Sequence, residues 1–406
     1  MVQRRGLDKP LLVTSAAILA LGLLTLYSAG ETDVPTGVEG LWMKQLVWLG
    51  IGAAVAATAV RTSPRLLEWV TPFAYGIAVA LLLLTLFIGT GGGTAAGTRS
   101  WLAIGGVRIG QPTELAKLAT ILMLARHLGG RRRVPQALTE LLPACVIVGI
   151  PFALVSLQPD LGSAIVFLGI LFAVLFWVGA QAWQLLLLAS PVISLLRAFS
   201  TVSWGAWIIA LTLLLIWVRP YVLEGVSVWL INAVMGFLAL DLWSQLAPYQ
   251  QNRLLSFLNP EIDPRATGWN IIQSKVAIGS GGLLGKGFTQ GTQKRLAFLP
   301  AQHTDFIFPV LAEELGFVGV TVGLLLFAAL LLVLTRIARD ARDAFSSVAV
   351  FGVFGMLFTH VVENVGMTVG LMPITGIPLP LFSYGGSFLV VCCAAIGITL
   401  RVAWDS

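Results

Sequence analysis

The sequence contains few charged residues and almost no cysteine for its length. Asp, Glu, Lys and Arg together make up 11% of 406 residues, and the only three cysteines, Cys145, Cys392 and Cys393, all lie inside apolar runs. This distribution excludes a disulfide framework and a cysteine-based metal site. We also find no internal repeat, which argues against an inverted-repeat transporter.

Apolar residues dominate the remainder of the sequence. Hydrophobic residues account for 57% of the chain and the mean hydropathy is +0.90, which one soluble core cannot accommodate. The net charge of +6 would suggest nucleic acid in a soluble protein, but here the basic residues separate apolar segments and orient helices. The composition predicts a polytopic membrane protein with no nucleic-acid partner.

About twelve apolar runs are long enough to be transmembrane helices. We therefore expect an all-α polytopic protein forming a single transmembrane domain over residues 1–406, with a retained first helix. The runs are 10–29, 43–61, 69–90, 112–128, 137–157, 160–179, 183–198, 203–218, 227–247, 306–336, 345–370 and 384–402.

Basic residues predict the orientation of these helices. They cluster in alternate connections, which places those connections and both termini in the cytoplasm. The clusters are Arg4, Arg5 and Lys9; Arg61 and Arg65; Arg126 and Arg131 to Arg133; and Arg336, Arg339 and Arg342. The opposite, extracytoplasmic side then holds a Gly-rich loop at 90–111 and a long polar loop at 248–305.

The junction after this long loop is the strongest candidate for chemistry. His303, Thr304 and Asp305 stand at the mouth of an apolar run that later contains Glu313 and Glu314. Ionisable groups beside a membrane segment are costly and usually functional. His303 alone is more often a structural hydrogen-bond partner. For Asp305 the structural alternative is capping of a helix that begins at Phe306.

A second candidate lies in the fourth apolar run. Glu114 and Lys117 share one helix face after Pro112. They form either a self-neutralising ion pair or part of a polar cavity. Before them, Arg99 and Arg108 suit a pyrophosphate group at the lipid surface, or serve only to keep the loop soluble.

Lys286 follows a glycine-rich stretch, Gly279 to Gly287, that superficially resembles a phosphate-binding loop. It fails the P-loop pattern because Ser280 stands at the first glycine position and Gly287 replaces the required Ser or Thr. The glycines instead favour backbone that packs against helices.

Four blocks in order resemble the SEDS family across most of the chain. They are Trp101 to Lys117, Gln158 to Ser163, Gln273 to Glu314, and Gly376 to Pro380 with Ser383 to Ser387. Within the last region, Asn364 to Met367 and Met372 to Pro378 resemble the elongation branch of the family more than its division branch.

The resemblance implies a peptidoglycan glycosyltransferase that polymerises lipid II at the outer face of the bacterial cytoplasmic membrane and releases undecaprenyl pyrophosphate. It implies a class B penicillin-binding protein as partner, together with other membrane proteins of the elongation complex. The family's essential acidic residue falls on Asp305, and Arg99, Glu114 and Lys117 match its cavity.

The chain departs from the family pattern at several places. Thr113 replaces a usual Ser, Ala301 a common Glu, and Glu363 a usually apolar residue. The family is usually described with ten helices, so 183–226 is expected to be an extra helical segment outside the cavity.

The residues support attack of a sugar 4-hydroxyl on a lipid-linked pyrophosphate. Asp305 would accept the proton, while Arg99, Lys117, Arg108 or Lys286 would stabilise the leaving group. A divalent cation, Mg²⁺ or Mn²⁺, held by Asp305 is an open alternative. A lipid-linked precursor flippase using Glu114, Lys117 and Glu363, and a non-enzymatic scaffold, are the rival functions.

Overall fold

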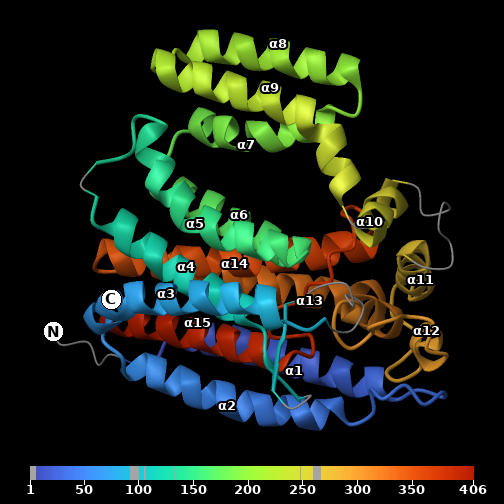
Figure 1. Cartoon of the computed structure of the whole chain (residues 1–406). Helices are drawn as coiled ribbons and strands as arrows, with labels where there is room; N and C mark the ends of the chain where they lie inside the picture. The colour runs from blue at the N-terminus through green and yellow to red at the C-terminus, as the bar shows by residue number, and fades with distance from the viewer. Residues whose placement is uncertain (1–5, 92–99, 105–106, 132, 247, 259–266) are drawn as a thin grey trace.

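The computed structural model describes residues 6–91, 100–104, 107–131, 133–246, 248–258 and 267–406. These residues form helices and one small antiparallel hairpin (Figure 1). The helices are α1 (Lys9–Gly30), α2 (Leu41–Arg61), α3 (Pro64–Ile88), α4 (Pro112–Gly129), η1 (Thr139–Leu141), α5 (Leu142–Leu157), α6 (Leu161–Trp177), α7 (Ala182–Arg197), α8 (Thr201–Val218), α9 (Val222–Gln245), α10 (Pro248–Leu258), α11 (Thr267–Ser280), α12 (Thr292–Arg295), α13 (Ile307–Asp340), α14 (Ala344–Val369) and α15 (Gly386–Asp405).

All twelve predicted apolar runs are helical. Among the described residues, nine helical segments are long and apolar enough to cross a membrane, and α6 and α7 are shorter apolar helices. The remaining one, α4, is the helix that contains Glu114 and Lys117. The chain is therefore an all-α polytopic membrane protein apart from the hairpin.

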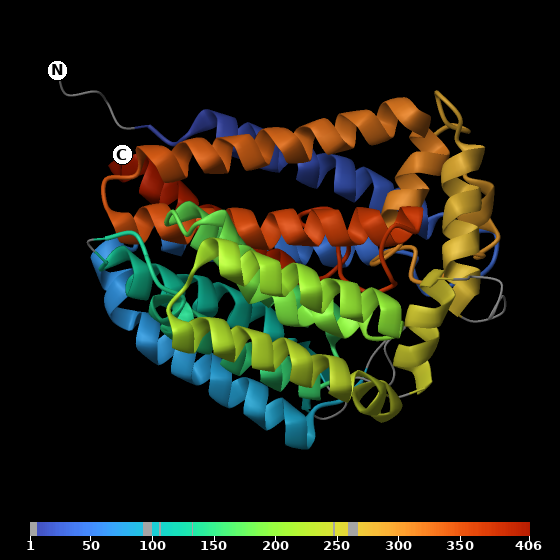
Figure 2. The same cartoon turned by 90° about the horizontal axis from the view of Figure 1, so that it is seen from above.

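Apart from the short helices α10, α11 and α12, the helices run roughly parallel to one long axis, and their connections gather at two ends (Figures 1 and 2). One end holds the start of α1 and the end of α15, while α10, α11 and α12 lie at the other (Figures 1 and 2). Ion pairs and hydrogen bonds tie each end together. At the first end Arg336 pairs with Asp8, and Arg126 donates to the Glu68 carbonyl at 3.2 Å.

The long helix α14 occupies the middle of the bundle. Small residues let its neighbours approach closely: a Cβ on Gly352 would lie 2.5 Å from Ile121 Cγ2, and one on Gly355 would lie 2.5 Å from Ala173 Cβ. Because α14 is wrapped by α4, α6 and α13, its polar side chains are buried rather than exposed to lipid.

Helices α7, α8 and α9 form a layer at the edge of the bundle (Figure 1). Buried Asn232 on α9 holds them together by donating to Ser190 Oγ at 2.7 Å and accepting from Trp207 at 3.3 Å. The layer is tied to the first end by Glu224, which accepts from the Thr139 backbone N–H at 3.0 Å. The segment 183–226 accordingly lies away from α14.

The two predicted loops contain short elements that the sequence analysis did not identify. The Gly-rich loop at 90–111 contains a hairpin of β1 (Leu102–Ile104) and β2 (Val107–Gly110), and the polar loop at 248–305 contains α10, α11 and α12. The helices were missed because short amphipathic helices at a membrane surface have too little apolar length to stand out as spans.

Helix α13 is broken at Gly316, which has φ 62° and ψ −160°. The segment 281–287 fills the break. The backbone N–H groups of Lys286 and Gly287 donate to the carbonyls of Glu313 and Glu314, each at 3.0 Å, while Phe317 N–H donates to Gly282 O at 2.9 Å. These bonds replace those the break removes. The predicted packing of the glycine-rich stretch against a helix is confirmed.

Glycine is required at the contact itself. A Cβ on Gly285 would lie 2.0 Å from the Glu314 carbonyl oxygen, and Gly285 also has φ +80°. A side chain at this position would both clash and strain the backbone.

Candidate active site

Asp305 lies two residues before α13, which begins at the end of the bundle that holds α10, α11 and α12 (Figure 1). The helix begins at Ile307 with Phe306 at the N-cap position, one residue later than predicted, so neither Thr304 nor Asp305 is the N-cap residue. Asp305 is 7% exposed. A Cβ on Gly376 would lie 3.3 Å from Asp305 Oδ2, so only a small residue there leaves room at the carboxylate.

The connection between α14 and α15, residues 370–385, turns back along α14. Asn364 donates to the carbonyl of Ile377 at 2.8 Å, and His360 Nδ1 lies 3.1 Å from the carbonyl of Pro378. Both side chains belong to α14, upstream of its end at Val369. The connection is therefore re-entrant, and we call it the re-entrant segment.

The re-entrant segment also holds the backbone around Asp305. Ser383 Oγ donates to the Thr304 carbonyl at 2.6 Å, and Tyr384 N–H donates to the His303 carbonyl at 2.9 Å. Asn364 donates to the Asp305 carbonyl at 3.0 Å as well as to Ile377. The candidate carboxylate is thus positioned by residues far from it in sequence.

Lys117 and Glu114 form the predicted pair inside the bundle. Lys117 Nζ lies 2.8 Å from Glu114 Oε1, and the side chains are 0% and 4% exposed. Lys117 Nζ also lies 3.0 Å from His360 Nε2 and 5.6 Å from the centre of the Phe388 ring. The ammonium is therefore held by groups from α4, α14 and α15, not by Glu114 alone.

A connection made of four hydrogen bonds and one backbone link joins the backbone at Asp305 to the Lys117 ammonium. It runs from the Asp305 carbonyl through Asn364 to Ile377, continues along the backbone to Pro378, and passes through His360 to Lys117. The site consequently combines a carboxylate at the helix mouth with a buried cation below it.

Asp160 ties the starts of α4 and α6 to this region. Its Oδ1 accepts from Ser163 N–H at 3.1 Å and caps α6, while its Oδ2 accepts from Gln111 Nε2 at 3.0 Å. Gln111 is the N-cap residue of α4. This contact fixes the helix that bears Glu114 and Lys117 beside α6.

Glu363 is fully buried on α14, and neither carboxylate oxygen has a hydrogen-bond partner among the described residues. The nearby Thr375 hydroxyl donates instead to the sulfur of Met367 at 3.7 Å. An ionisable group in this state destabilises a folded protein unless it takes up a proton or a ligand.

Replacing Glu363 with Gln is expected to raise the midpoint of thermal unfolding, since an amide cannot ionise and burying it costs less than burying an unpaired carboxylate. Glu314→Gln is the matched control. Glu314 is equally buried but pairs with Lys294 at 2.8 Å, so its replacement should lower the midpoint by leaving a buried ammonium unpaired. A lower midpoint for Glu363→Gln would contradict the expectation.

His303 lies in the turn before Asp305. Its ring centre is 6.0 Å from that of Tyr384, and its Nδ1 is buried with no hydrogen-bond partner among the described atoms. Burial lowers the pKa of the imidazole below its usual value. Burial thus favours the neutral form of the ring. A substrate-binding role for His303 stays a prediction.

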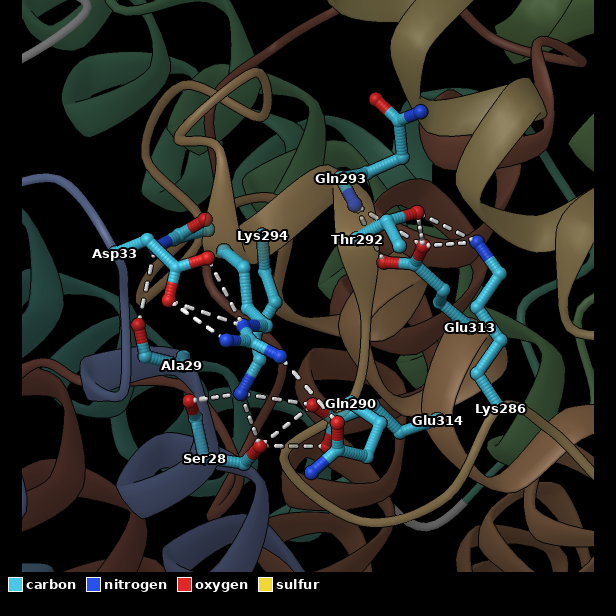
Figure 3. Close-up of polar contacts among 12 residues, drawn as sticks. Ser28, Ala29, Asp33, Lys286, Gln290, Thr292, Gln293, Lys294, Glu313 and Glu314 are labelled. Carbon is cyan, nitrogen blue, oxygen red and sulfur yellow. Dashed lines mark hydrogen bonds and ion pairs between the residues drawn. The ribbon is translucent and has the colours of Figure 1, made fainter.

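Lys286 belongs to an ionic network beside the site. Lys286 Nζ lies 2.7 Å from Glu313 Oε1, which also accepts from Thr292 Oγ1 at 3.0 Å (Figure 3). Buried Lys294 contacts both Ser28 and Glu314 in the same view. The network links the end of α1 to α12 and α13, so Lys286 has a structural partner in addition to its predicted substrate role.

The two predicted arginines differ in what the structure describes. Arg99 lies outside the described residues. The backbone of Arg108 is described and pairs with Ala103 in the hairpin.

The described residues also contain no group of three or more His, Cys, Asp or Glu side chains that could hold a metal ion. A metal bound by Asp305 stays a prediction.

The sequence analysis did not identify His360 as a site residue, and it named Asn364 only as part of a motif shared with the family. The available signal was a polar stripe in an apolar helix, since His360, Glu363 and Asn364 share one face of α14. The partner of His360, Lys117, is 243 positions away, so no local pattern could have paired the two.

Comparisons with known proteins agree on one family. A family model described as "Cell cycle protein", covering FtsW, RodA and SpoVE, matches residues 9–221 and 202–406. The chain is similar to peptidoglycan glycosyltransferase MrdB of Escherichia coli strain K12, with 37% identity over 98% of this chain and 93% of the relative. It is 34% identical to peptidoglycan glycosyltransferase RodA of Treponema pallidum strain Nichols, covering 97% of both chains.

The fold is similar to that of a chain in a solved peptidoglycan synthase complex that coordinates polymerization and crosslinking. The TM-score is 0.72 at 32% identity, and 98% of each chain is covered.

Proposed function

The chain belongs to the FtsW/RodA/SpoVE family of peptidoglycan glycosyltransferases, also called SEDS proteins, and on that premise we propose that it polymerises lipid II during cell elongation. The observation that supports this most directly is the set of contacts that ties the backbone at Asp305 and the buried ammonium of Lys117 to one segment. Asn364 binds the carbonyls of Asp305 and Ile377, and His360 lies between the carbonyl of Pro378 and Lys117.

The chemistry follows from these two groups. A sugar 4-hydroxyl attacks the anomeric carbon of the lipid-linked donor, and the bond from that carbon to the pyrophosphate oxygen breaks. Asp305 accepts the hydroxyl proton. The departing undecaprenyl pyrophosphate gains negative charge, which the ammonium of Lys117 stabilises in a site shielded from water. Arg99, Arg108 and Lys286 are further candidates for contacts to phosphate, and a divalent cation at Asp305 would contribute the same stabilisation.

Purified protein with its partner and lipid II should form glycan polymer that a gel assay resolves. The rival role as a flippase predicts transport of lipid II across vesicle membranes without polymer. Membership of the family does not separate elongation from division, so the second test is genetic. The chain should restore rod shape to cells depleted of their elongation polymerase and should not restore division.

The proposed orientation places twelve helices across the membrane as one domain, with both termini in the cytoplasm. Alternation of α1 to α9 and α13 to α15 supports it, because α10, α11 and α12 then fall on the outer side with Asp305 (Figure 1). In this arrangement 248–305 is the extracytoplasmic segment and 183–226 supplies the extra helices.

Cysteine labelling tests this orientation. In intact cells an impermeant maleimide should label Leu284→Cys, since Leu284 is 79% exposed in the 281–287 segment, and should not label Arg133→Cys in the α4–α5 connection. The unsubstituted chain, with its three native cysteines, supplies the background. The reverse labelling pattern would reject the orientation and the outer location of the site.

The proposed partner is a class B penicillin-binding protein within a larger elongation complex. The similar fold found in a peptidoglycan synthase complex supports a partner of this kind. Co-purification of the two membrane proteins from cells is the direct check.

A further inference from the structure

His360 is a fully buried histidine in the middle of the bundle, with one ring nitrogen facing α4 and the other facing the re-entrant segment. Its ring stacks on Phe388 of α15 at 4.5 Å between centres, with an angle of 25° between the planes. Stacking alone would need only an aromatic ring. The two nitrogens therefore call for a separate explanation.

The contacts determine where the imidazole proton lies. Nδ1 is 3.1 Å from the Pro378 carbonyl, which can only accept, so Nδ1 carries the proton and donates. Nε2 is 3.0 Å from the Lys117 ammonium, which can only donate. Nε2 must then present its lone pair. A single neutral tautomer satisfies both contacts, and protonation of both nitrogens would place two cations in contact.

This tautomer restricts the Lys117 ammonium. Glu114 alone would leave the ammonium free to swing about one hydrogen bond, whereas two acceptors on different helices, Glu114 and His360, define its position. An ammonium has three N–H donors. Two are directed at these acceptors, and no acceptor among the described residues is assigned to the third, which has the Phe388 ring centre 5.6 Å from the nitrogen.

We propose that His360 is a positioning residue: its Nε2 lone pair fixes the Lys117 ammonium so that the third N–H meets a phosphate oxygen of the lipid-linked donor. The proposal rests on the proposed function, because it assigns Lys117 to the pyrophosphate. His360 does not touch the substrate. His360 acts through Lys117. The Pro378 carbonyl of the re-entrant segment accepts from Nδ1 of His360 and so keeps the ring in the tautomer whose Nε2 is unprotonated.

Two substitutions separate positioning from packing. His360→Phe keeps an aromatic ring for stacking on Phe388 but removes both nitrogens, while His360→Gln keeps an acceptor and a donor. We expect His360→Phe to lower kcat for polymerisation by about 10²-fold, the effect of misplacing one group by about 1 Å, with a smaller change in KM. His360→Gln should recover part of kcat. His127→Phe, at the other end of α4, is the control and should retain parental kcat.

Binding of undecaprenyl pyrophosphate gives a test that does not depend on turnover. Lys117→Met and His360→Phe should each weaken binding, and the double variant should bind no more weakly than Lys117→Met alone, since His360 acts only through that lysine. Independent effects that multiply in the double variant would overturn the proposal. If His360→Phe does not fold, His360→Met takes its place in the same cycle.

The parental protein separates this proposal from the function on which it rests. Absence of polymer from the parental complex would reject the polymerase function. Polymer from the parental protein with unchanged kcat in a folded His360→Phe variant would reject only the positioning role.

Discussion

Asp305→Asn is expected to abolish detectable glycan polymer while leaving expression, thermal stability and partner binding intact. General base catalysis contributes roughly 10²–10⁴-fold to rate, and the amide cannot accept the hydroxyl proton. The variant keeps nearly the same volume beside Gly376 and changes neither the Asp305 carbonyl nor its bond from Asn364. Asp305→Ala should behave in the same way. The gel assay with lipid II and partner measures both.

Asp33→Asn is the matched control, because it removes a carboxylate from the same end of the bundle. Asp33 is 51% exposed and pairs with Arg295 at 2.9 Å, and exposed pairs of this kind contribute little to stability. Its polymer yield should be near parental. Near-parental yield from Asp305→Asn as well would falsify the catalytic assignment and favour the flippase or scaffold.

Asp305→Glu distinguishes a proton acceptor from a metal ligand. The longer side chain misplaces the carboxylate in either role, but only a weakened metal ligand can be compensated by mass action. Titrating Mg²⁺ or Mn²⁺ into the assay should restore part of the polymer yield if Asp305 binds a cation. A yield that does not respond to either metal supports proton acceptance.

The double substitution of Lys117→Met with Glu114→Leu should give a folded protein that makes no detectable polymer. Removing both partners of a buried ion pair spares the cost of an orphaned charge, so the fold should survive. Loss of a group that stabilises charge in the transition state typically lowers kcat by about 10²–10³-fold. Circular dichroism and thermal unfolding would establish the fold, and the gel assay the activity.

A second same-helix pair provides the comparison. Arg401 and Asp405 on α15 lie 3.0 Å apart at the opposite end of the bundle, and Arg401→Met with Asp405→Leu should retain polymer formation. Retention of normal polymerisation by the Lys117 and Glu114 double variant would instead show that this pair only neutralises itself.

Sequence alone was sufficient for nine helical segments that are long and apolar enough to cross a membrane among the described residues, and for the Glu114–Lys117 pair, since three residues along a helix bring side chains together. It could not reveal the break in α13. A single glycine, Gly316, marks the break, and its missing hydrogen bonds are made by residues about thirty positions earlier. Such long-range backbone pairing leaves no local periodicity.

The candidate site was predictable only in part for the same reason. Asp305 was identified because a carboxylate at a helix mouth is costly, but its surroundings come from the re-entrant segment, which follows it by about seventy residues. Lys286 was predicted to stabilise the leaving group, and its pairing with Glu313 depends on how 281–287 folds onto α13. Tertiary packing therefore decided which predicted charges have partners.

Ile377 and Pro378 are adjacent in the sequence, and this adjacency limits how far α14 and the re-entrant segment can move relative to each other. The two carbonyls belong to successive residues, and they bind Asn364 and His360 of a single helix. The re-entrant segment and α14 thus hold the backbone at Asp305 and the ammonium of Lys117 through two successive residues of one segment. If α4 or α13 slides along α14, the hydrogen bond from Lys117 to His360 or the one from Asn364 to Asp305 must break. We therefore expect two states of the site, one with these bonds intact and one with them broken, as in other tightly packed interiors. A signal arriving from outside the bundle would switch such a site on or off rather than adjust its rate by degrees.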